Sequence, residues 1–259
     1  MTVGTKRWCW VALAVAGWLL LADGRAVSGL DLDHVVTLHR KAKAFLADGD
    51  YEGALESARE MEASAHKAQI LARVAQVRVS QGRTEESKEL LSEAVTMASI
   101  APQLKYEDVE AFFEIGVAYL KMEDLGRAAK SFEEAMDRDE EMADFPVSQR
   151  LFSVALLRDY DFFIAARVAL AYVEAGDFEE ALRLCRERQM DIYGKGSTAA
   201  TAIVLTKIAL GYMALNDPAQ ARQAIDEALA MAETVSNESL RGSLRDDILL
   251  IRDTQINPT

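Results

Sequence analysis

The sequence predicts an all-α fold: an α-solenoid of about five helical hairpins closed by a C-terminal capping helix. Three observations predict it. Small and apolar residues recur at helical spacing, short turns that contain Gly, Asn or Asp separate the helical stretches, and no long linker or low-complexity segment interrupts the chain. Half of the 259 residues are hydrophobic and only four are proline. The chain can therefore bury a substantial core as one helical domain.

The first 26 residues differ in kind from the rest. Two basic residues precede an apolar run at 8–22, and small residues follow at Gly24 and Ala26. This pattern predicts a secretory signal peptide over residues 1–26. The run is shorter than the ~20 residues that a membrane-spanning helix needs, so we expect cleavage near Gly24 or Ala26 and a secreted or periplasmic protein. The alternative is a membrane anchor formed by an uncleaved N-terminal segment.

The clearest hairpin lies at 109–140. Gly116 and Tyr119 belong to its first helix, and Ala128 and Phe132 belong to its second. This spacing resembles the tetratricopeptide repeat, in which a small residue of one helix meets a large residue of the other. On the same register we predict a helical repeat domain over residues 27–259, with repeats at about 35–67, 68–100, 109–140, 162–190 and 202–232.

Each hairpin carries local signals that agree with this resemblance. Small residues such as Ala169 and Ala209 let two helices approach closely. Pro218 stands where the first residue of a helix is expected, and Asp177 with Glu180 predicts a capping box. Aspartates that can cap second helices occur at Asp50, Asp124, Asp177 and Asp217.

The repeats are uneven in length. Steps between equivalent small residues are 33, 41, 53 and 40 residues, against a usual period of about 34. We assign the longest step to an insertion at 138–161, which adds a helix or lengthens one. A final helix at 239–254, capped by Ser239, is typical of the capping helix that a solenoid needs.

The resemblance implies a protein-binding adaptor without catalytic activity, in which the first helix of each hairpin lines a concave groove. The register predicts that this groove changes from polar near His39, Lys43, Gln69 and Gln76 to apolar further along the chain. Its apolar half binds a segment or helix of another protein, or neighbouring helices and the insertion cover it. The predicted apolar groove residues are Phe113, Val117, Leu120, Phe163, Leu170, Val173, Ile203, Leu210 and Met213.

Other chemistries have little support in the sequence. His34, His39 and His66 lack the spacing of metal ligands, and the segment 194–198 lacks the strand and glycine pattern of a phosphate loop. We therefore expect no catalytic residue, no metal and no cofactor. The net charge of −13 argues against nucleic acid and against anionic lipid as partners, so membrane contact after signal cleavage is not expected.

Two other functions stay open. The chain could be a self-assembling structural protein, in which one copy occupies the groove of another and forms a homo-oligomer. It could also be a carrier that encloses a small apolar ligand between its helices. The first predicts an oligomer in solution, and the second predicts lipid bound to the purified protein.

Overall fold

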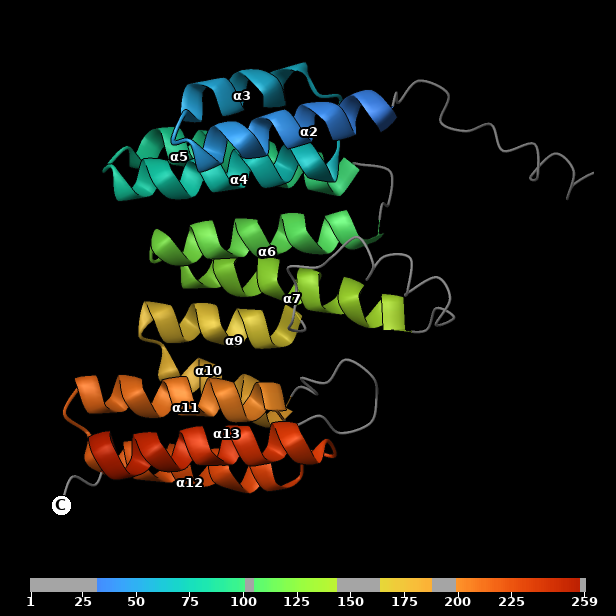
Figure 1. The fold of residues 1–259 in the computed structure, drawn as a ribbon. Coiled ribbons are helices and arrows are strands. Elements are labelled where there is room, and N and C mark those ends of the chain that lie inside the picture. Colours follow the sequence, from blue (N-terminus) through green and yellow to red (C-terminus); the bar gives the residue numbers. More distant parts are fainter. Residues whose placement is uncertain (1–31, 101–104, 144–163, 188–198, 257–259) are drawn as a thin grey trace, which may run out of the picture.

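The computed structural model describes residues 32–100, 105–143, 164–187 and 199–256, and these residues form a stack of helices joined by short turns (Figure 1). The described ranges contain no strand. The fold class predicted from the sequence, an all-α solenoid, is confirmed. The five hairpins pair α2 (Leu32–Ala47) with α3 (Tyr51–Glu60), α4 (Ala65–Ser80) with α5 (Thr84–Ile100), α6 (Lys105–Lys121) with α7 (Leu125–Ala143), α9 (Ile164–Ala175) with α10 (Phe178–Glu187), and α11 (Ala199–Ala214) with α12 (Pro218–Glu233).

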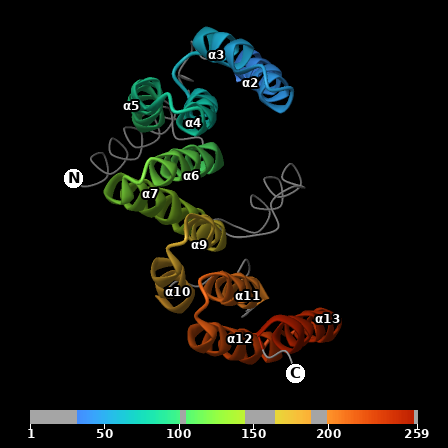
Figure 2. The same cartoon turned by 90° about the vertical axis from the view of Figure 1, so that its left-hand side faces the viewer.

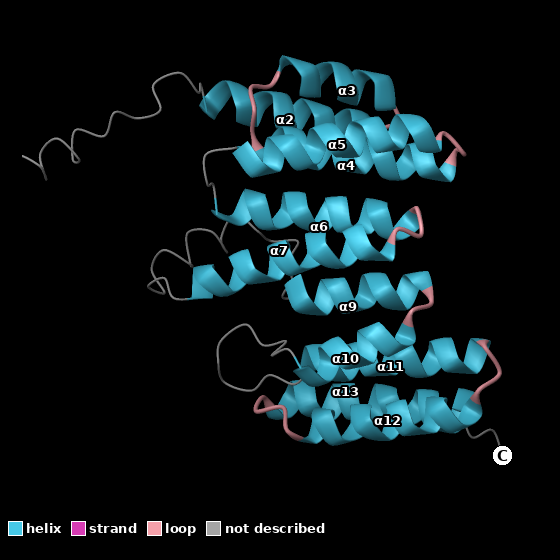
Figure 3. Ribbon diagram, turned by 180° about the vertical axis from the view of Figure 1, so that it is seen from behind, coloured by secondary structure: helices cyan, strands magenta, loops and turns pink. Residues whose placement is uncertain are grey.

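The hairpins stack in two layers, and the stack is curved (Figure 2). The first helices, α2, α4, α6, α9 and α11, lie on the inside of the curve, and each contacts the next along the stack. The second helices form the outer layer. We call the solvent-facing surface of the first helices the inner face. The same stack seen from behind shows helices that run roughly side by side (Figure 3).

All five hairpins share one turn geometry. The turn residues with positive φ, between 58° and 83°, are Gly49, Gly82, Glu123, Gly176 and Asn216, one in each hairpin. In every turn the amide of the following residue donates to the carbonyl five positions earlier, at 2.8–3.0 Å. This is the bond of a Schellman motif, which ends a helix by satisfying a free carbonyl. The repeated turn shows that the described chain up to α12 consists of five hairpins with the same turn geometry.

The four predicted capping aspartates are confirmed. Asp50, Asp124, Asp177 and Asp217 each accept a hydrogen bond from the amide three residues later, at 2.9–3.2 Å. The predicted capping box was wrong in its second half. The amide of Asp177 donates to the carbonyl of Tyr172, and the Glu180 carboxylate accepts from Arg183 instead. The backbone bond to Tyr172 uses the Asp177 amide, which is the donor that a capping box would need.

Small residues face large ones within and between hairpins, as the repeat pattern predicts. A Cβ atom added to Gly116 would lie 2.5 Å from the ring of Phe132, and one added to Gly211 would lie 2.3 Å from the ring of Phe178. The Phe132 ring meets Tyr172 of the next hairpin edge-on, with centroids 5.4 Å apart. The core is therefore continuous from one hairpin to the next.

The stack ends in α13 (Glu238–Ile251), followed by a short π-helical turn at Arg252–Ile256. Ile248 and Ile256 are buried at this end. The predicted cap, Ser239, was wrong, because the side chain of Asn237 accepts from the amide of Leu240 at 3.0 Å. None of the helices that the structure describes combines the length and the apolar character required to cross a bilayer.

Several sequence predictions fall outside the described residues. α7 ends at Ala143 and α9 begins at Ile164, so most of the predicted insertion lies between the described ranges. The predicted signal segment at 1–26, Phe163 and the glycine-containing segment at 194–198 also lie outside them.

Candidate functional site

Each first helix presents one stripe of side chains to the inner face. On α11, Ile203, Lys207 and Leu210 follow each other at spacings of four and three residues and are half-buried or exposed, whereas Leu205 and Ile208 are in the core. Such spacing places side chains on one side of a helix. The equivalent pairs are Arg40 and Lys43 on α2, Arg73 and Gln76 on α4, Glu114 and Val117 on α6, Arg167 and Leu170 on α9, and Lys207 and Leu210 on α11.

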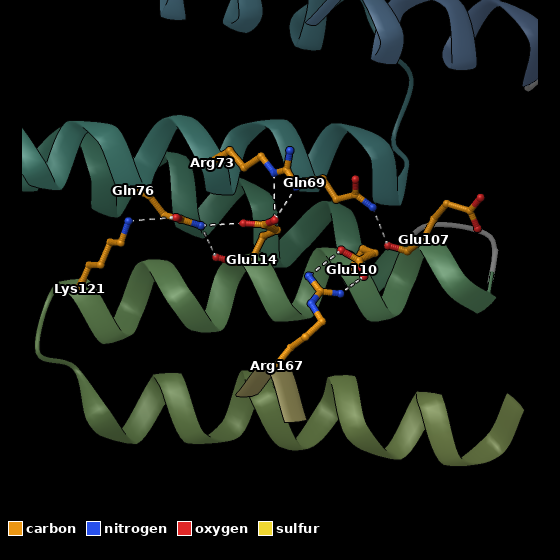
Figure 4. Close-up of polar contacts among 8 residues, drawn as sticks. All are labelled: Gln69, Arg73, Gln76, Glu107, Glu110, Glu114, Lys121 and Arg167. Carbon is orange, nitrogen blue, oxygen red and sulfur yellow. Dashed lines mark hydrogen bonds and ion pairs between the residues drawn. The ribbon is translucent and has the colours of Figure 1, made fainter. Parts of the chain in front are cut away.

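A polar network joins α4 to α6 across the inner face (Figure 4). The Glu114 carboxylate accepts from Nε and Nη2 of Arg73 at 2.9 and 2.7 Å, and from the Gln76 amide at 2.8 Å. Lys121 donates to the Gln76 side-chain oxygen at 3.3 Å. The Glu114 side chain is only 10% exposed, so its charge requires these partners. The network fixes the second hairpin against the third.

A second buried carboxylate joins α6 to α9. The Glu110 carboxylate accepts hydrogen bonds from both terminal nitrogens of Arg167, and the bond from Nη2 is 3.1 Å long. The same guanidinium lies 4.0 Å from the centroid of the Phe113 ring. Such an arrangement combines a charge-assisted bidentate bond with a cation–π contact. Arg167 therefore holds the third hairpin against the fourth.

Two histidines pack against each other where α2 contacts α4. The rings of His39 and His66 stack with centroids 4.2 Å apart and planes 16° apart. Burial, together with the nearby His66, Lys43 and Arg73, lowers the pKa of His39 to about 3. Burial and Lys43 also lower the pKa of His66. Both rings are therefore neutral at physiological pH and act as packing groups.

The predicted groove residues divide into three groups. Phe113, Val117, Leu170, Val173, Ile203, Leu210 and Met213 are half-buried on three neighbouring first helices. Leu120 is only 6% exposed and belongs to the core, so it offers almost no surface to a partner. Phe163 is outside the described residues. The half-buried residues lie on helices that contact one another, α6 with α9 and α9 with α11.

The sequence did not predict the four charged residues that connect the first helices: Arg73, Glu110, Glu114 and Arg167. A signal for them exists. Arg40, Arg73, Glu114, Arg167 and Lys207 occupy the same register position in the five copies, and a charge repeated at one position of a solenoid forms a row along its surface.

The outer layer contains a hollow of about 440 Å³ beside α10 and α12, lined in part by Arg183, Arg186 and Tyr212. Its arginines are already paired, Arg183 with Glu180 and Arg186 with Glu227. Its lining therefore resembles an ion-paired surface and not a pocket for an apolar molecule. Among the described residues, no group of three or more His, Cys, Asp or Glu could hold a metal ion.

Comparison with known proteins finds a family match for part of the chain. Residues 73–143, which run from the middle of α4 to the end of α7, match the tetratricopeptide repeat family. Repeats of this family generally mediate protein–protein interaction, and the family is typically non-enzymatic. No curated protein matches the chain.

Proposed function

We propose that this tetratricopeptide-repeat protein is a non-enzymatic adaptor of the cell envelope or periplasm that binds a segment of a partner protein on its inner face. The observation that carries the proposal is the surface formed by Val117, Leu170 and Leu210. These side chains occupy equivalent positions on three neighbouring helices, and all three are half-buried where a solvent-facing helix position would ordinarily be polar. Apolar surface repeated along one face is typical of a protein-binding site.

The rigidity of the inner face supports the same proposal. Buried carboxylates bonded to Arg73 and Arg167 hold successive first helices in fixed positions. A surface that keeps its shape in the free protein loses little conformational entropy on binding. A partner segment would therefore meet a preformed groove.

The chemistry of the described side chains supports a non-enzymatic role. Burial raises the pKa of the Cys185 thiol to about 12, so the thiol stays protonated and is a poor nucleophile. His39 and His66 are held neutral by burial and face each other. These groups do not form a nucleophile with an adjacent general base.

The envelope location rests on the N-terminal sequence. The apolar run at 8–22, preceded by basic residues and followed by small ones, supports export and cleavage. Mass measurement of the protein recovered from its own cells tests this. A chain that begins near residue 25 or 27 in the envelope fraction agrees with the proposal, and an intact chain in the cytoplasm contradicts it.

Partner capture tests the binding role. The full chain, expressed with its N-terminal segment, is used to capture proteins from an envelope extract of the source organism, alongside a Leu170→Glu, Leu210→Glu variant. The matched control is Ile100→Glu, Leu125→Glu, which changes two exposed apolar residues at the ends of outer-layer helices. Circular dichroism verifies that both variants are folded.

The two variants separate the possible results. A protein retained by the wild type and by the control, but lost from the inner-face variant, agrees with the proposal. Equal retention by all three proteins contradicts an inner-face site. If only further copies of the chain are recovered, the self-assembling alternative replaces the adaptor.

A further inference from the structure

The two layers of the solenoid carry opposite charge. The five first helices contain ten lysines and arginines against six aspartates and glutamates, a net charge of +4. The five second helices contain eight against nineteen, a net charge of −11. A chain with a net charge of −13 thus places a basic layer on the inside of its curve.

Some cations of the first helices have no carboxylate partner among the described residues, whereas Lys67 and Arg78 pair with Glu93 and Glu52 of second helices. On the outer layer, Lys88 pairs with Glu85 at 2.6 Å, and Arg186 pairs with Glu227 at 2.9 Å. On the inner face, Arg40, Lys43 and Lys207 are exposed, and no carboxylate in the described part of the chain forms an ion pair with them. Lys121 is exposed as well and donates to the neutral amide of Gln76 (Figure 4).

The buried carboxylates of the inner layer do not neutralise this surplus. Glu114 is bonded to Arg73 and Gln76, and Glu110 is bonded to Arg167. Their side chains are 10% and 4% exposed, so little of either charge faces solvent. The exposed charge of the inner face is therefore positive, and it is concentrated on α2 and at the end of α6.

The apolar part of the inner face lies at the other end of the stack. Leu170 on α9 and Ile203 and Leu210 on α11 are half-buried, with Lys207 among them as an exposed cation. The inner face thus changes along its length, from exposed cations on α2 and at the end of α6 to apolar side chains that begin at Val117 on α6 and continue over α9 and α11.

We propose, on the premise that the inner face binds a partner as argued above, that its ligand is an acidic amphipathic segment of another protein. Carboxylates of the segment lie over Arg40, Lys43 and Lys121, and its apolar side chains lie over Leu170 and Leu210. Complementary charge steers such a segment to the groove and sets its register, and apolar contact adds affinity. Nucleic acid is disfavoured, because the acidic outer layer repels phosphates around the few inner cations.

Selection from a peptide library tests the chemistry of this ligand. The full chain selects from displayed random peptides about 28 residues long, roughly eight helical turns, which is long enough to span the four steps of about 10 Å from α2 to α11. The selected peptides are expected to be enriched in Asp and Glu together with Leu, Ile, Val and Phe. Their affinity is expected to fall roughly tenfold, equivalent to about 1.4 kcal/mol, in an Arg40→Glu, Lys43→Glu variant. Added salt is expected to weaken binding to the wild type more than to this variant.

The matched control reverses two charges on the outer layer. Lys88→Glu, Lys130→Glu changes the net charge by the same amount, at two exposed positions on α5 and α7. It is expected to leave affinity nearly unchanged. Circular dichroism of both variants separates loss of binding from loss of folding, and a variant that unfolds is replaced by Lys43→Gln, Lys121→Gln.

The possible failures are distinguishable. Selected peptides without acidic enrichment, or equal losses in the inner and outer variants, overturn the charge proposal and leave an inner-face binding role intact. If no peptide is selected, the binding role itself is contradicted. If the chain self-associates and Arg40→Glu, Lys43→Glu abolishes the association, the ligand is the acidic outer layer of a second copy, and the proposal is wrong.

Discussion

The inner face has a different chemical character in two regions of the stack. It is polar over the second and third hairpins and apolar over the fourth and fifth, although all four are copies of the same repeat. Between α4 and α6, Glu114 is bonded to Arg73 and Gln76. Between α9 and α11, the equivalent region presents Leu170 and Leu210. Both regions nevertheless pack a phenylalanine ring on a glycine, within the third hairpin for Phe132 on Gly116 and between the fourth and fifth hairpins for Phe178 on Gly211. The comparison shows that close packing of small against large residues recurs in both regions, while the chemistry of the inner-face positions varies.

The largest expected effect concerns the ion pair that joins the third hairpin to the fourth. Glu110→Leu leaves the guanidinium of Arg167, whose side chain is 17% exposed, without its carboxylate. We expect a loss of about 3 kcal/mol in the free energy of unfolding. On the apolar half, Leu170→Ala removes a half-buried side chain and is expected to cost about 1 kcal/mol. Urea denaturation measures both.

A second variant separates charge from packing. Glu110→Leu with Arg167→Met replaces the ion pair by apolar groups, and we expect it to recover most of the lost stability. If Glu110→Leu costs no more than Leu170→Ala, the Glu110–Arg167 pair does not hold the third hairpin against the fourth.

The next effect concerns the glycine–phenylalanine contacts that occur in both regions. Gly116→Ala forces a methyl group against Phe132, and Gly211→Ala forces one against Phe178. Both are expected to reduce the free energy of unfolding by about 2 kcal/mol through overpacking. Thermal denaturation of the two variants checks that the losses are similar. A cost confined to one variant would show that the two cores differ.

A smaller effect is the pH dependence of stability at the contact between the first and second hairpins, where His39 packs on His66. The pKa of His39 is lowered to about 3, so the unfolded chain takes up a proton below about pH 6.5 while the folded chain does not. This contribution to stability is present above the unfolded pKa and is lost as the pH falls. Asp108 acts in the opposite direction, because burial raises its pKa to about 6 and the folded chain binds that proton first.

A His39→Gln variant separates the contribution of the His39 imidazole to the pH dependence of stability from that of Asp108. Between about pH 7 and about pH 5, we expect wild type to lose on the order of 1 kcal/mol more stability than His39→Gln. Urea titrations at the two pH values measure the difference. Identical pH dependence in the two proteins would show that His39 is not held neutral.

The smallest effect concerns the hairpin turns. Glu123 has φ 60°, where three other turns have glycine. Glu123→Gly is expected to stabilise the chain by about 0.5 kcal/mol, since a side chain is unfavourable in this conformation. Asn216→Gly is expected to gain less, because asparagine tolerates positive φ. Differential scanning calorimetry measures both, and destabilisation by Glu123→Gly would contradict the shared turn geometry.

The features that the sequence predicts well are local. The capping aspartates and Pro218 act within one turn of a helix, and the pairing of Gly116 with Phe132 lies within one hairpin. Ser239 failed as a cap because Asn237, two residues earlier, offers a competing side-chain acceptor. Leu120 failed as an exposed groove residue because its direction depends on how α6 is rotated in the stack.

The polar network could not be predicted from one hairpin alone. Arg73 reaches a residue 41 positions away, and Arg167 reaches one 57 positions away. Such contacts depend on how successive hairpins stack, and the uneven steps between the repeats conceal that geometry. The charge difference between the layers follows from the same stacking, because only the fold shows which helices face inward.

The most direct test of the inner face as the binding surface is lysine footprinting. The full chain is acetylated briefly with and without a saturating selected peptide, and mass spectrometry reads each site. Lys43, Lys121 and Lys207 on first helices are expected to be protected, while Lys88 and Lys130 on the outer layer react at unchanged rates. Protection of Lys88 and Lys130 with unchanged reaction of the three inner lysines would contradict the account.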